Sequence, residues 1–573
     1  MPIFRSIFNN FLNAKQKVNF CLLILLMFIS SLLEILGISF IIPLIGNLLG
    51  DQNLPNSYFS TFFDKFNFLN LISIYNLLFL FLLIFVFKFF FLLYFYYYET
   101  RFIFGFKERL SSKLFFNYLN RDYRIIKKNS SVLLNNILIE VDQVTQYLDA
   151  LAKYLLDIMV VTGLVIFLLY YNFYVSISII SVLFSFIFFH LVFFKKRINS
   201  WGSQRLDSAN RRIQYLNEGI TGNKTIKIFN SENFFYLKFL DYNKLFKNIS
   251  IKINFLQNVP KVLLELLGIL SLLSVIIYAL ELNYGLNSII QLLGVFLFAF
   301  FKIVPSLNRI VGNLQIMRFL KISVDLIIDE KVKQDFSNSS KEAFNFENDI
   351  SLKINNFSYK NSDSKISDGD ILIKNIDLKI NKNEKIGIVG PSGAGKSTLL
   401  DIFSGLIVLE KDSVFVDNKS IYPNTKGWQK IIGYVPQKTF IIEDTLKNNI
   451  LFGIDEKKIS DTFFDEILLK SNLFNLVNRL PKGVNTIIKE EGHNFSGGEV
   501  QRIGLARAFI RKPKVLILDE ATSSLDTKNE NEIIQDLLKI TNLTIISVTH
   551  RHSALKSFNK IYNLDKGSLD LVE

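Results

Sequence analysis

The chain has 573 residues, a formal net charge of +14 at pH 7 and one cysteine. This length predicts more than one domain, and the single cysteine excludes an intramolecular disulfide and a cysteine-rich metal site. Half of the residues are apolar, and the long runs of phenylalanine, leucine and isoleucine lie within the first 310 positions. The cations lie mainly beside these runs, which indicates a membrane topology and no nucleic-acid partner.

Six apolar runs approach the roughly 20 residues that cross a bilayer. The stretches 99–148 and 195–256, which follow the second and fourth runs, are rich in lysine and arginine. The opposite loops carry almost no cations beyond Lys65. The positive-inside rule therefore predicts both termini and both long stretches in the cytosol. The six runs lie at 20–46, 71–97, 150–171, 173–194, 260–282 and 286–306.

The polar segments beside the spans also show helical patterns. The stretches 99–148 and 195–256 stay periodic, so we expect the spanning helices to run well past the membrane. Breaks near 121–136 and 219–235 predict a short transverse helix at the bottom of each hairpin. The N-terminal segment 2–17 carries its apolar residues on one helical face and is predicted to lie in the membrane interface. It shows no signal-peptide cleavage site, so the first span is expected to be retained.

A phosphate-binding loop follows in the polar part of the chain. The strand pattern "KIGIVG" leads into "GPSGAGKST" and the helix-forming "LLDIF", which fits G-x-x-x-x-G-K-[ST] in its required context. Backbone N–H groups and a helix N-terminus suit phosphates. Lys396 is predicted to reach the β- and γ-phosphates of a nucleotide, and the Ser397 hydroxyl to bind Mg²⁺. The loop residues are Gly390, Pro391, Ser392, Gly393, Ala394, Gly395, Lys396, Ser397 and Thr398.

A second motif, "VLILDE", is an apolar strand that ends in two carboxylates. Phosphoryl transfer needs alignment, charge neutralisation and an oriented nucleophile. Asp519 is therefore predicted to bind Mg²⁺, and Glu520 to polarise the attacking water.

With the segment "FSGGEVQR", the motifs resemble the ATP-binding cassette of ABC transporters. Six preceding spans make the whole chain resemble a type IV exporter half-transporter. The resemblance implies an α-helical polytopic membrane domain, residues 1–328, fused by a linker, 329–347, to an α/β P-loop ATPase domain, 348–573. The motifs, in chain order, are the phosphate-binding loop, "GYVPQ", "FSGGE", "LILDE", "SSLD" and "SVTH".

The resemblance also implies roles for single residues of the cassette. Tyr359 would stack on the adenine of ATP, and an aromatic residue that only packs in a strand is the alternative. Gln437 would sense Mg²⁺ and the attacking water. His550 would contact the γ-phosphate, and Asp526 would lie across the dimer seam. Glu490 would belong to the segment that meets the transverse helices.

The signature segment implies a dimer. Ser496, Gly497 and Gly498 would bind the nucleotide held by the opposite protomer. Phe495 and Glu499 depart from the commoner leucine and glutamine, and a carboxylate there could retune nucleotide affinity. Because one chain supplies every element of a competent site, we expect a homodimer, with a heterodimer as the alternative.

Ionisable residues in the spans are expensive in lipid, so each is expected to face the interior of the bundle. Lys88 and Lys302 lie at the same depth, about 25 Å below the outer edge at 1.5 Å per residue, and Arg309 returns to nearly the same face as Lys302. Three interpretations stay open: the cations snorkel to the interface, pair with Glu34 or Asp157 inside the bundle, or meet an anionic cargo head group. The residues in the spans are Glu34, Lys88, Asp157, Glu265 and Lys302.

Short segments of the first, second and sixth spans resemble the PglK-type flippases, which move lipid-linked oligosaccharides in bacterial protein N-glycosylation. These segments are "EILGISFIIPLIGNLL", "FVFKFF" and "FKIVPSLNRIV". The resemblance implies a polyprenyl-pyrophosphate glycan as cargo, with the pyrophosphate at Lys88, Lys302 and Arg309. The aromatic loop 54–70 is expected to lie in the outer interface, where it holds the polyprenyl tail or only anchors the protein.

We therefore expect an ATP-driven flippase or exporter of a lipid-linked anionic glycan, with ATP and Mg²⁺ as cofactors. It is expected to lie among the lipids of the bacterial cytoplasmic membrane and to flip its cargo to the outer leaflet. The alternatives are export of another amphipath, such as lipid A, a hydrophobic drug or a peptide, and an ATP-gated channel or regulatory subunit. The intact Glu520 and His550 disfavour the last class, because a regulator need not hydrolyse ATP quickly.

Overall fold

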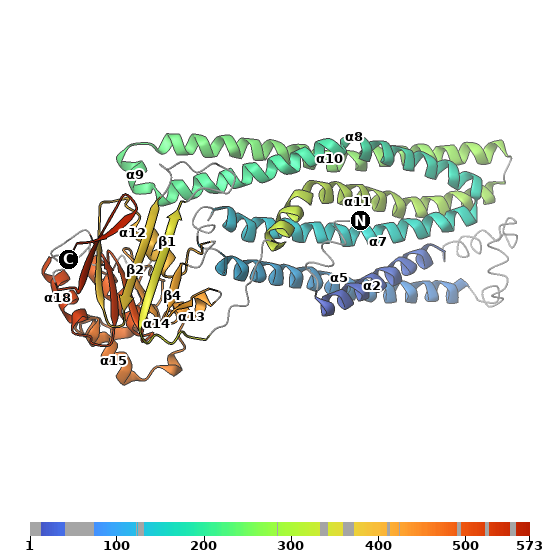
Figure 1. Cartoon of the computed structure of the whole chain (residues 1–573). Helices are drawn as coiled ribbons and strands as arrows, with labels where there is room; N and C mark the ends of the chain where they lie inside the picture. Colours follow the sequence, from blue (N-terminus) through green and yellow to red (C-terminus); the bar gives the residue numbers. More distant parts are fainter. Residues whose placement is uncertain are drawn as a thin grey trace. The chain divides into compact units, whose positions relative to one another are not determined.

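The computed structural model has two compact units, a helical one whose described residues end at Val332 and an α/β one in which the described residues after this unit begin at Glu342. Figure 1 colours the chain from the blue N-terminus to the red C-terminus. The described residues are 13–39, 74–121, 123, 131–282, 285–332, 342–358, 372–409, 413–422, 424–489, 494–521, 527–549 and 557–572.

Six long helices make up the helical unit, and each is long and apolar enough to cross a membrane. This confirms the six predicted spans. Three of the helices have 46, 49 and 50 residues, about twice the length that a bilayer requires, so the predicted continuation of the helices into the polar stretches is also confirmed. The six helices are α2 (Ala14–Ser39), α5 (Ile74–Leu119), α7 (Val141–Tyr171), α8 (Phe173–Thr221), α10 (Glu232–Glu281) and α11 (Leu286–Val332).

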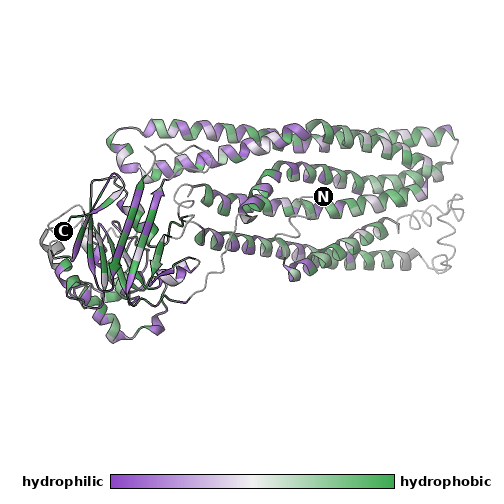
Figure 2. Cartoon of the chain, in the orientation of Figure 1, coloured by the Kyte–Doolittle hydropathy of each residue, from purple (hydrophilic) through white to green (hydrophobic). Residues whose placement is uncertain are grey.

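The hydropathy of the helices changes along their length. Figure 2 shows apolar stretches in green that give way to mixed green and purple where α8 and α10 approach α9 (Asn223–Ile228). This short helix confirms the prediction near 219–235. The tight turn between α7 and α8 is also confirmed. Asn172 leaves the helical conformation there, and its side chain accepts a hydrogen bond from the backbone N–H of Val175 at 3.2 Å.

Several expected elements fall largely or wholly outside the described residues: the interfacial N-terminal helix, the aromatic external loop and the transverse helix near 121–136. The domain boundaries at 328 and 348 stay predictions. Within the described residues, α11 continues to Val332 and so enters the predicted linker.

The core of the helical unit lies between α7, α8, α10 and α11. Helices α10 and α11 approach closely at Gly268, where an added Cβ atom would lie 1.5 Å from Cζ of Phe300. The phenylalanine ring therefore occupies the space that any larger residue at position 268 would need.

A buried ion pair ties α8 to the start of α7 and to α11. One π-helical turn, η1 (Asn136–Glu140), precedes α7 and ends at Glu140, whose carboxylate accepts a hydrogen bond of 2.9 Å from Arg205 of α8. The same guanidinium donates to the hydroxyl of Ser323 on α11 at 2.7 Å. The side chains of Arg205 and Glu140 are 5% and 0% exposed, so each charge depends on the other.

The α/β unit contains two sheets. The first is antiparallel, in the order β2-β1-β4-β5; the second has the order β10-β9-β3-β8-β7-β6, with β10 antiparallel to β9 and the remaining neighbours parallel. The strands are β1 (Asp349–Phe357), β2 (Ile373–Asn381), β3 (Lys385–Val389), β4 (Val414–Val416), β5 (Lys419–Ser420), β6 (Ile432–Val435), β7 (Val515–Asp519), β8 (Thr544–Val548), β9 (Lys560–Asp565) and β10 (Ser568–Leu571).

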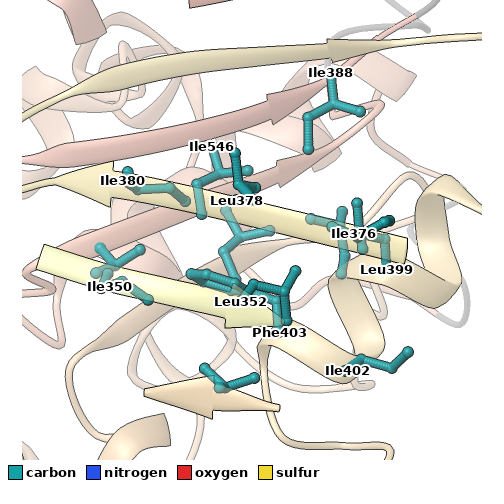
Figure 3. Packing of buried hydrophobic residues seen from close by; sticks show 14 of the residues in the cluster. Ile350, Leu352, Ile376, Leu378, Ile380, Ile388, Leu399, Ile402, Phe403 and Ile546 are labelled. Atoms are coloured by element: carbon teal, nitrogen blue, oxygen red, sulfur yellow. The ribbon is translucent and has the colours of Figure 1, made fainter. Parts of the chain in front are cut away.

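Burial in these strands follows the sequence. Apolar and polar residues alternate along β1, whereas β7 and β8 are buried throughout, as expected for strands in the middle of a parallel sheet. Figure 3 shows the inward side chains of β1 and β2 packed over Leu399, Ile402 and Phe403 of α12. The helices are α12 (Lys396–Phe403), α13 (Thr425–Gln429), α14 (Leu446–Leu451), η3 (Glu456–Lys458), α15 (Asp461–Lys470), α16 (Phe474–Arg479), η4 (Gly483–Asn485), α17 (Gly497–Phe509) and α18 (Thr527–Leu538).

The buried ion pair predicts a stability difference. Glu140→Gln leaves Arg205 without its counter-ion and should cost about 3–5 kcal/mol, which corresponds to a fall of roughly 5–15 °C in apparent Tm. Differential scanning fluorimetry of the full chain in detergent measures this shift. The control is Lys321→Met, which breaks the half-exposed 3.9 Å pair with Asp325 and should cost less than about 1 kcal/mol. Equal shifts in the two variants would contradict the prediction.

Candidate functional site

The phosphate-binding loop connects β3 to α12, as the sequence predicts. Gly390 has φ 153°, and a Cβ atom there would lie 2.2 Å from the carbonyl oxygen of Leu564. Gly395, with φ 101°, precedes the first residue of α12. Both positions require glycine. The Lys396 ammonium donates to the carbonyl oxygens of Gly390 and Pro391 at 2.8 and 3.0 Å, so the lysine lies folded within its own loop.

Asp519 lies at the end of β7, beside this loop. Its carboxylate accepts hydrogen bonds from the Ser397 hydroxyl at 3.4 Å and from the Tyr434 hydroxyl at 3.1 Å. Strands β6 and β7 are parallel neighbours, which explains why Tyr434 and Asp519 meet at one end of the sheet. Tyr434 was not predicted as a site residue; the sequence signal for it is its place in "GYVPQ", three residues before Gln437.

Glu520 follows in a left-handed backbone conformation, with φ 48°. This conformation is uncommon for a non-glycine residue and typically costs about 1–3 kcal/mol. The backbone N–H of Glu520 donates to the carbonyl oxygen of Val548 at 2.9 Å, and its carboxylate accepts a 2.7 Å hydrogen bond from Nε2 of Gln437. The structure therefore brings together Gln437, Asp519, Glu520 and the phosphate-binding loop.

Burial shifts the protonation equilibria of this site. It raises the pKa of Asp519, and the neighbouring charge of Glu520 acts in the same direction. Burial also lowers the pKa of Lys396, against the opposing effect of Glu520 and Asp519. Each of these groups has lost hydration that stabilises its charged form. A bound partner of opposite charge would compensate for this loss: a cation at Asp519 and a phosphate at Lys396.

The signature segment forms the start of α17, where Ser496 is the N-cap. Glu499 completes a capping box with it: the backbone N–H and the hydroxyl of Ser496 both donate to the Glu499 carboxylate, at 2.8 and 2.9 Å. The hydroxyl also accepts from the Glu499 N–H at 3.3 Å. Phe495 packs against the apolar core of this part of the unit. Both departures from the commoner signature sequence therefore have a structural role.

Four residues with implied roles, Tyr359, Glu490, Asp526 and His550, lie outside the described residues. Gly497 and Gly498 begin α17, beside Ser496. The remaining loop residues, Ser392, Gly393, Ala394 and Thr398, lie in the phosphate-binding loop and the first turn of α12.

The three cations that the sequence suggests for the cargo, Lys88, Lys302 and Arg309, are each paired with a carboxylate. Lys88 of α5 and Lys302 of α11 both contact the carboxylate of Glu34 on α2, at 2.8 and 3.3 Å. The side chain of Lys88 is 9% exposed, whereas that of Lys302 is 47% exposed. The snorkelling interpretation is therefore wrong for Lys88, and the pairing that the sequence left open is present.

Arg309 has a different geometry. Its guanidinium donates to Asp157 of α7 through Nε at 3.0 Å and Nη2 at 2.6 Å, and Nη2 also donates to Ser306 at 2.8 Å. The Asp157 side chain is 2% exposed. The three cations therefore face two carboxylates, which leaves one net positive charge. Glu265, the remaining ionisable residue of the predicted spans, is exposed on α10, against the expectation that it faces the interior.

A membrane unit of six helices thus accompanies a unit that carries a phosphate-binding loop and a carboxylate pair, which defines an ATP-dependent membrane protein. The ABC transporter transmembrane region matches residues 20–304 and the ABC transporter domain matches residues 373–523. A Rickettsia typhi protein described as an export ATP-binding/permease protein is 30% identical over 463 residues, which cover 79% of this chain and 78% of the relative. The chain therefore belongs to the ABC transporters.

Other relatives agree with this assignment. The multidrug resistance-like ATP-binding protein MdlA of Buchnera aphidicola is 29% identical over 490 residues, 82% of each chain. A solved structure of a bacterial Atm1-family ABC exporter with ATP bound has a TM-score of 0.77 at 17% identity and covers 98% of this chain and 94% of that one. The chain is a multi-pass membrane ATPase that couples ATP hydrolysis to transport, and its exporter half-transporter fold indicates dimerisation.

The negative charge of Glu499 at the start of α17 predicts that this residue weakens ATP binding. Glu499→Gln keeps the hydrogen-bonding capacity of the cap and removes a negative charge from the helix end that we expect to face the partner's triphosphate. A like charge about 4 Å away in water costs about 1 kcal/mol, so the KM for ATP should fall about fivefold. Steady-state ATPase assays measure this, with Glu466→Gln, an exposed glutamate of α15, as the control. An unchanged KM for Glu499→Gln would contradict the prediction.

Proposed function

We propose that the protein is an ATP-driven flippase that moves a polyprenyl-pyrophosphate oligosaccharide from the cytosolic to the outer leaflet of the bacterial inner membrane. The observation that carries the proposal is the set of cations on α5 and α11. After pairing with Glu34 and Asp157, this set keeps one net positive charge, and Lys302 stays half exposed. A net positive charge among apolar helices costs free energy, so its presence favours an anionic cargo. The resemblance to PglK-type flippases implies that this anion is a pyrophosphate.

In the proposed homodimer, the phosphate-binding loop holds the triphosphate of ATP, and Lys396 turns from its loop carbonyls to the phosphates. Ser397, Asp519 and Gln437 supply hydroxyl, carboxylate and amide oxygens, the ligand types that Mg²⁺ prefers. The donor set fits because Gln437 donates to Glu520 through Nε2, which leaves its amide oxygen for a cation. Bound Mg²⁺ would neutralise charge on the phosphates.

Glu520 orients the attacking water in this proposal, with Gln437 holding its carboxylate. His550 contacts the γ-phosphate, Asp526 lies at the dimer seam and Tyr359 stacks on adenine. Ser496, Gly497 and Gly498 of one protomer bind the nucleotide of the other. Closure of the two cassettes around ATP then moves the transverse helices, and hydrolysis returns the spans to the inward-facing state.

A second candidate is export of another amphipath, such as a glycolipid, a hydrophobic drug or a peptide. The name of the multidrug resistance-like relative supports it, since 82% of this chain aligns with that protein. The two candidates differ in charge: the pyrophosphate needs the cations, whereas a hydrophobic drug gains nothing from them.

The role of Glu520 predicts a trapped state. Glu520→Gln keeps a partner for Gln437 but no longer polarises water, so ATP should bind and turnover should fall by at least about 100-fold. ATPase assays and retention of radiolabelled ATP measure the two effects, with Glu466→Gln as the control for protein quality. Turnover at the wild-type rate would exclude Glu520 as the group that activates water.

The proposed cargo predicts a loss of coupling. Lys302→Ala combined with Lys88→Ala leaves Glu34 without its cations, and transport of a short-glycan polyprenyl pyrophosphate per ATP hydrolysed should fall at least about tenfold. Proteoliposomes with fluorescently labelled cargo measure translocation. Lys321→Ala, an exposed cation near the end of α11, is the control. Unimpaired transport by the double variant would exclude the two lysines as groups that bind the cargo.

A further inference from the structure

The helical unit contains a polar cavity apart from the paired cations. Its volume is about 470 Å³, and its walls come from η1, α7, α8, α10 and α11. Five of its lining residues are amides: Gln143 and Gln146 of α7, Asn254 and Gln257 of α10, and Asn313 of α11. We call this cavity the amide chamber.

The amides of the chamber have unused hydrogen-bonding capacity. Within the described ranges, none of the five amide side chains has a hydrogen-bond partner in the protein. The residues on α7 and on α10 are each three positions apart, a spacing that places side chains on one helical face. Each amide offers two N–H donors and a carbonyl acceptor. A ligand in the chamber would therefore meet donors and acceptors from three helices.

The charged residues of the wall largely neutralise one another. Lys153 donates to Asp149 at 2.7 Å, and Arg205 is paired with Glu140. Among the charged groups that line the chamber, Nε of the buried Arg205 has no hydrogen-bond partner within the described residues. Such a wall offers little to an anion, which needs free cations, and it would cost a fully apolar ligand the desolvation of five amides.

The chamber suits a neutral, hydroxyl-rich ligand. Sugar hydroxyls both donate and accept hydrogen bonds, as the amides do. Phe246 and Phe319 also line the chamber and offer apolar surface to the C–H groups of a sugar ring. A few polar groups among apolar and aromatic walls are typical of sites that bind small ligands with a fixed orientation.

The position of the chamber relative to the cations agrees with this. On α11, Asn313 lies one turn beyond Arg309; on α7, Lys153 lies one turn before Asp157. One turn of four residues corresponds to about 6 Å. The chamber thus adjoins the Asp157–Arg309 pair on the side that the predicted topology places toward the cytosol. A lipid-linked oligosaccharide carries its tail, its pyrophosphate and its glycan in that order. With the pyrophosphate at the cations, the glycan would therefore lie on the side where the chamber is.

We propose that the amide chamber binds the first sugars of a lipid-linked glycan while the pyrophosphate lies near Lys302. The inference rests on the proposed function, because it takes the same cargo and assigns a site to its sugar part. The chamber would distinguish a glycosylated lipid from the bare polyprenyl pyrophosphate, which the cations alone cannot do.

The test compares two lipids: polyprenyl pyrophosphate bearing a short neutral glycan, and the same lipid without sugar. The full-length protein is reconstituted in nanodiscs, and stimulation of its ATPase activity is titrated with each lipid. Wild type should respond to the glycosylated lipid at an about tenfold lower concentration. Two double variants, Gln143→Met with Gln146→Met and Asn254→Leu with Gln257→Met, should lose this preference and keep the response to the bare lipid. Asn258→Leu, an exposed amide of α10, is the control.

The outcomes separate the two proposals. If wild type responds to neither lipid, the proposed cargo is wrong and the assignment of the chamber falls with it. If wild type responds equally to both lipids, or if both double variants keep the preference for the glycosylated lipid, the anionic cargo stands and the amide chamber is excluded as its sugar site. Loss of the preference in both double variants, with the control unaffected, supports the chamber.

Discussion

Two carboxylates, Glu34 and Asp157, lie in helices that are otherwise largely apolar, and each is held by a cation from α11. An ionised carboxylate that is moved out of water needs a counter-charge and hydrogen bonds to offset its lost hydration. Lys302 and Arg309 supply these from one helix, and Lys88 adds a contact from α5. The positions of α2, α5 and α7 against α11 thus depend on these contacts, as well as on apolar packing that the lipid could equally provide.

The same requirement shapes the ATPase unit. Asp519 is buried at the end of a fully buried strand, and two hydroxyl groups, those of Ser397 and Tyr434, satisfy its oxygens. Glu520, the next residue, leaves the strand in a left-handed conformation that brings its carboxylate to Gln437. Adjacent acidic residues therefore differ in environment. The buried one suits a metal ion, and the more exposed one can reach a water molecule.

Much of the fold follows from local sequence patterns. Six apolar runs, the periodic stretches beyond them and the glycine-rich loop between a strand and a helix predict elements that the structure contains, because each pattern depends on residues close together in the chain. The sequence left the pairing of Glu34 with Lys302 as one of three interpretations, since the choice between them depends on the rotation and depth of two helices whose residues are 268 positions apart. The capping box of Glu499 was predictable from the S-x-x-E spacing, but the resemblance drew attention to the departure from glutamine instead.

The amides of the chamber were not predicted as site residues, for a different reason. Glutamine and asparagine cost less in a membrane helix than a charge does, so a search for ionisable residues passes over them. Only the three-dimensional structure shows that residues of three helices face one cavity. Helix α11 contributes to both the ion pairs and the amide chamber, because it carries Lys302, Arg309 and Asn313 along one side.

The two ion pairs of α11 differ in what an incoming anion could do to them. Arg309 grips Asp157 through two nitrogens, and the carboxylate is 2% exposed, so separating them would leave a buried charge without a partner. Lys302 is a single-point donor, half exposed and 3.3 Å from Glu34, and Glu34 keeps Lys88 at 2.8 Å if Lys302 turns away. An anionic group can therefore pair with Lys302 while Glu34 keeps a cationic partner. The geometry thus separates a cation that can exchange its partner from one that holds the helices together.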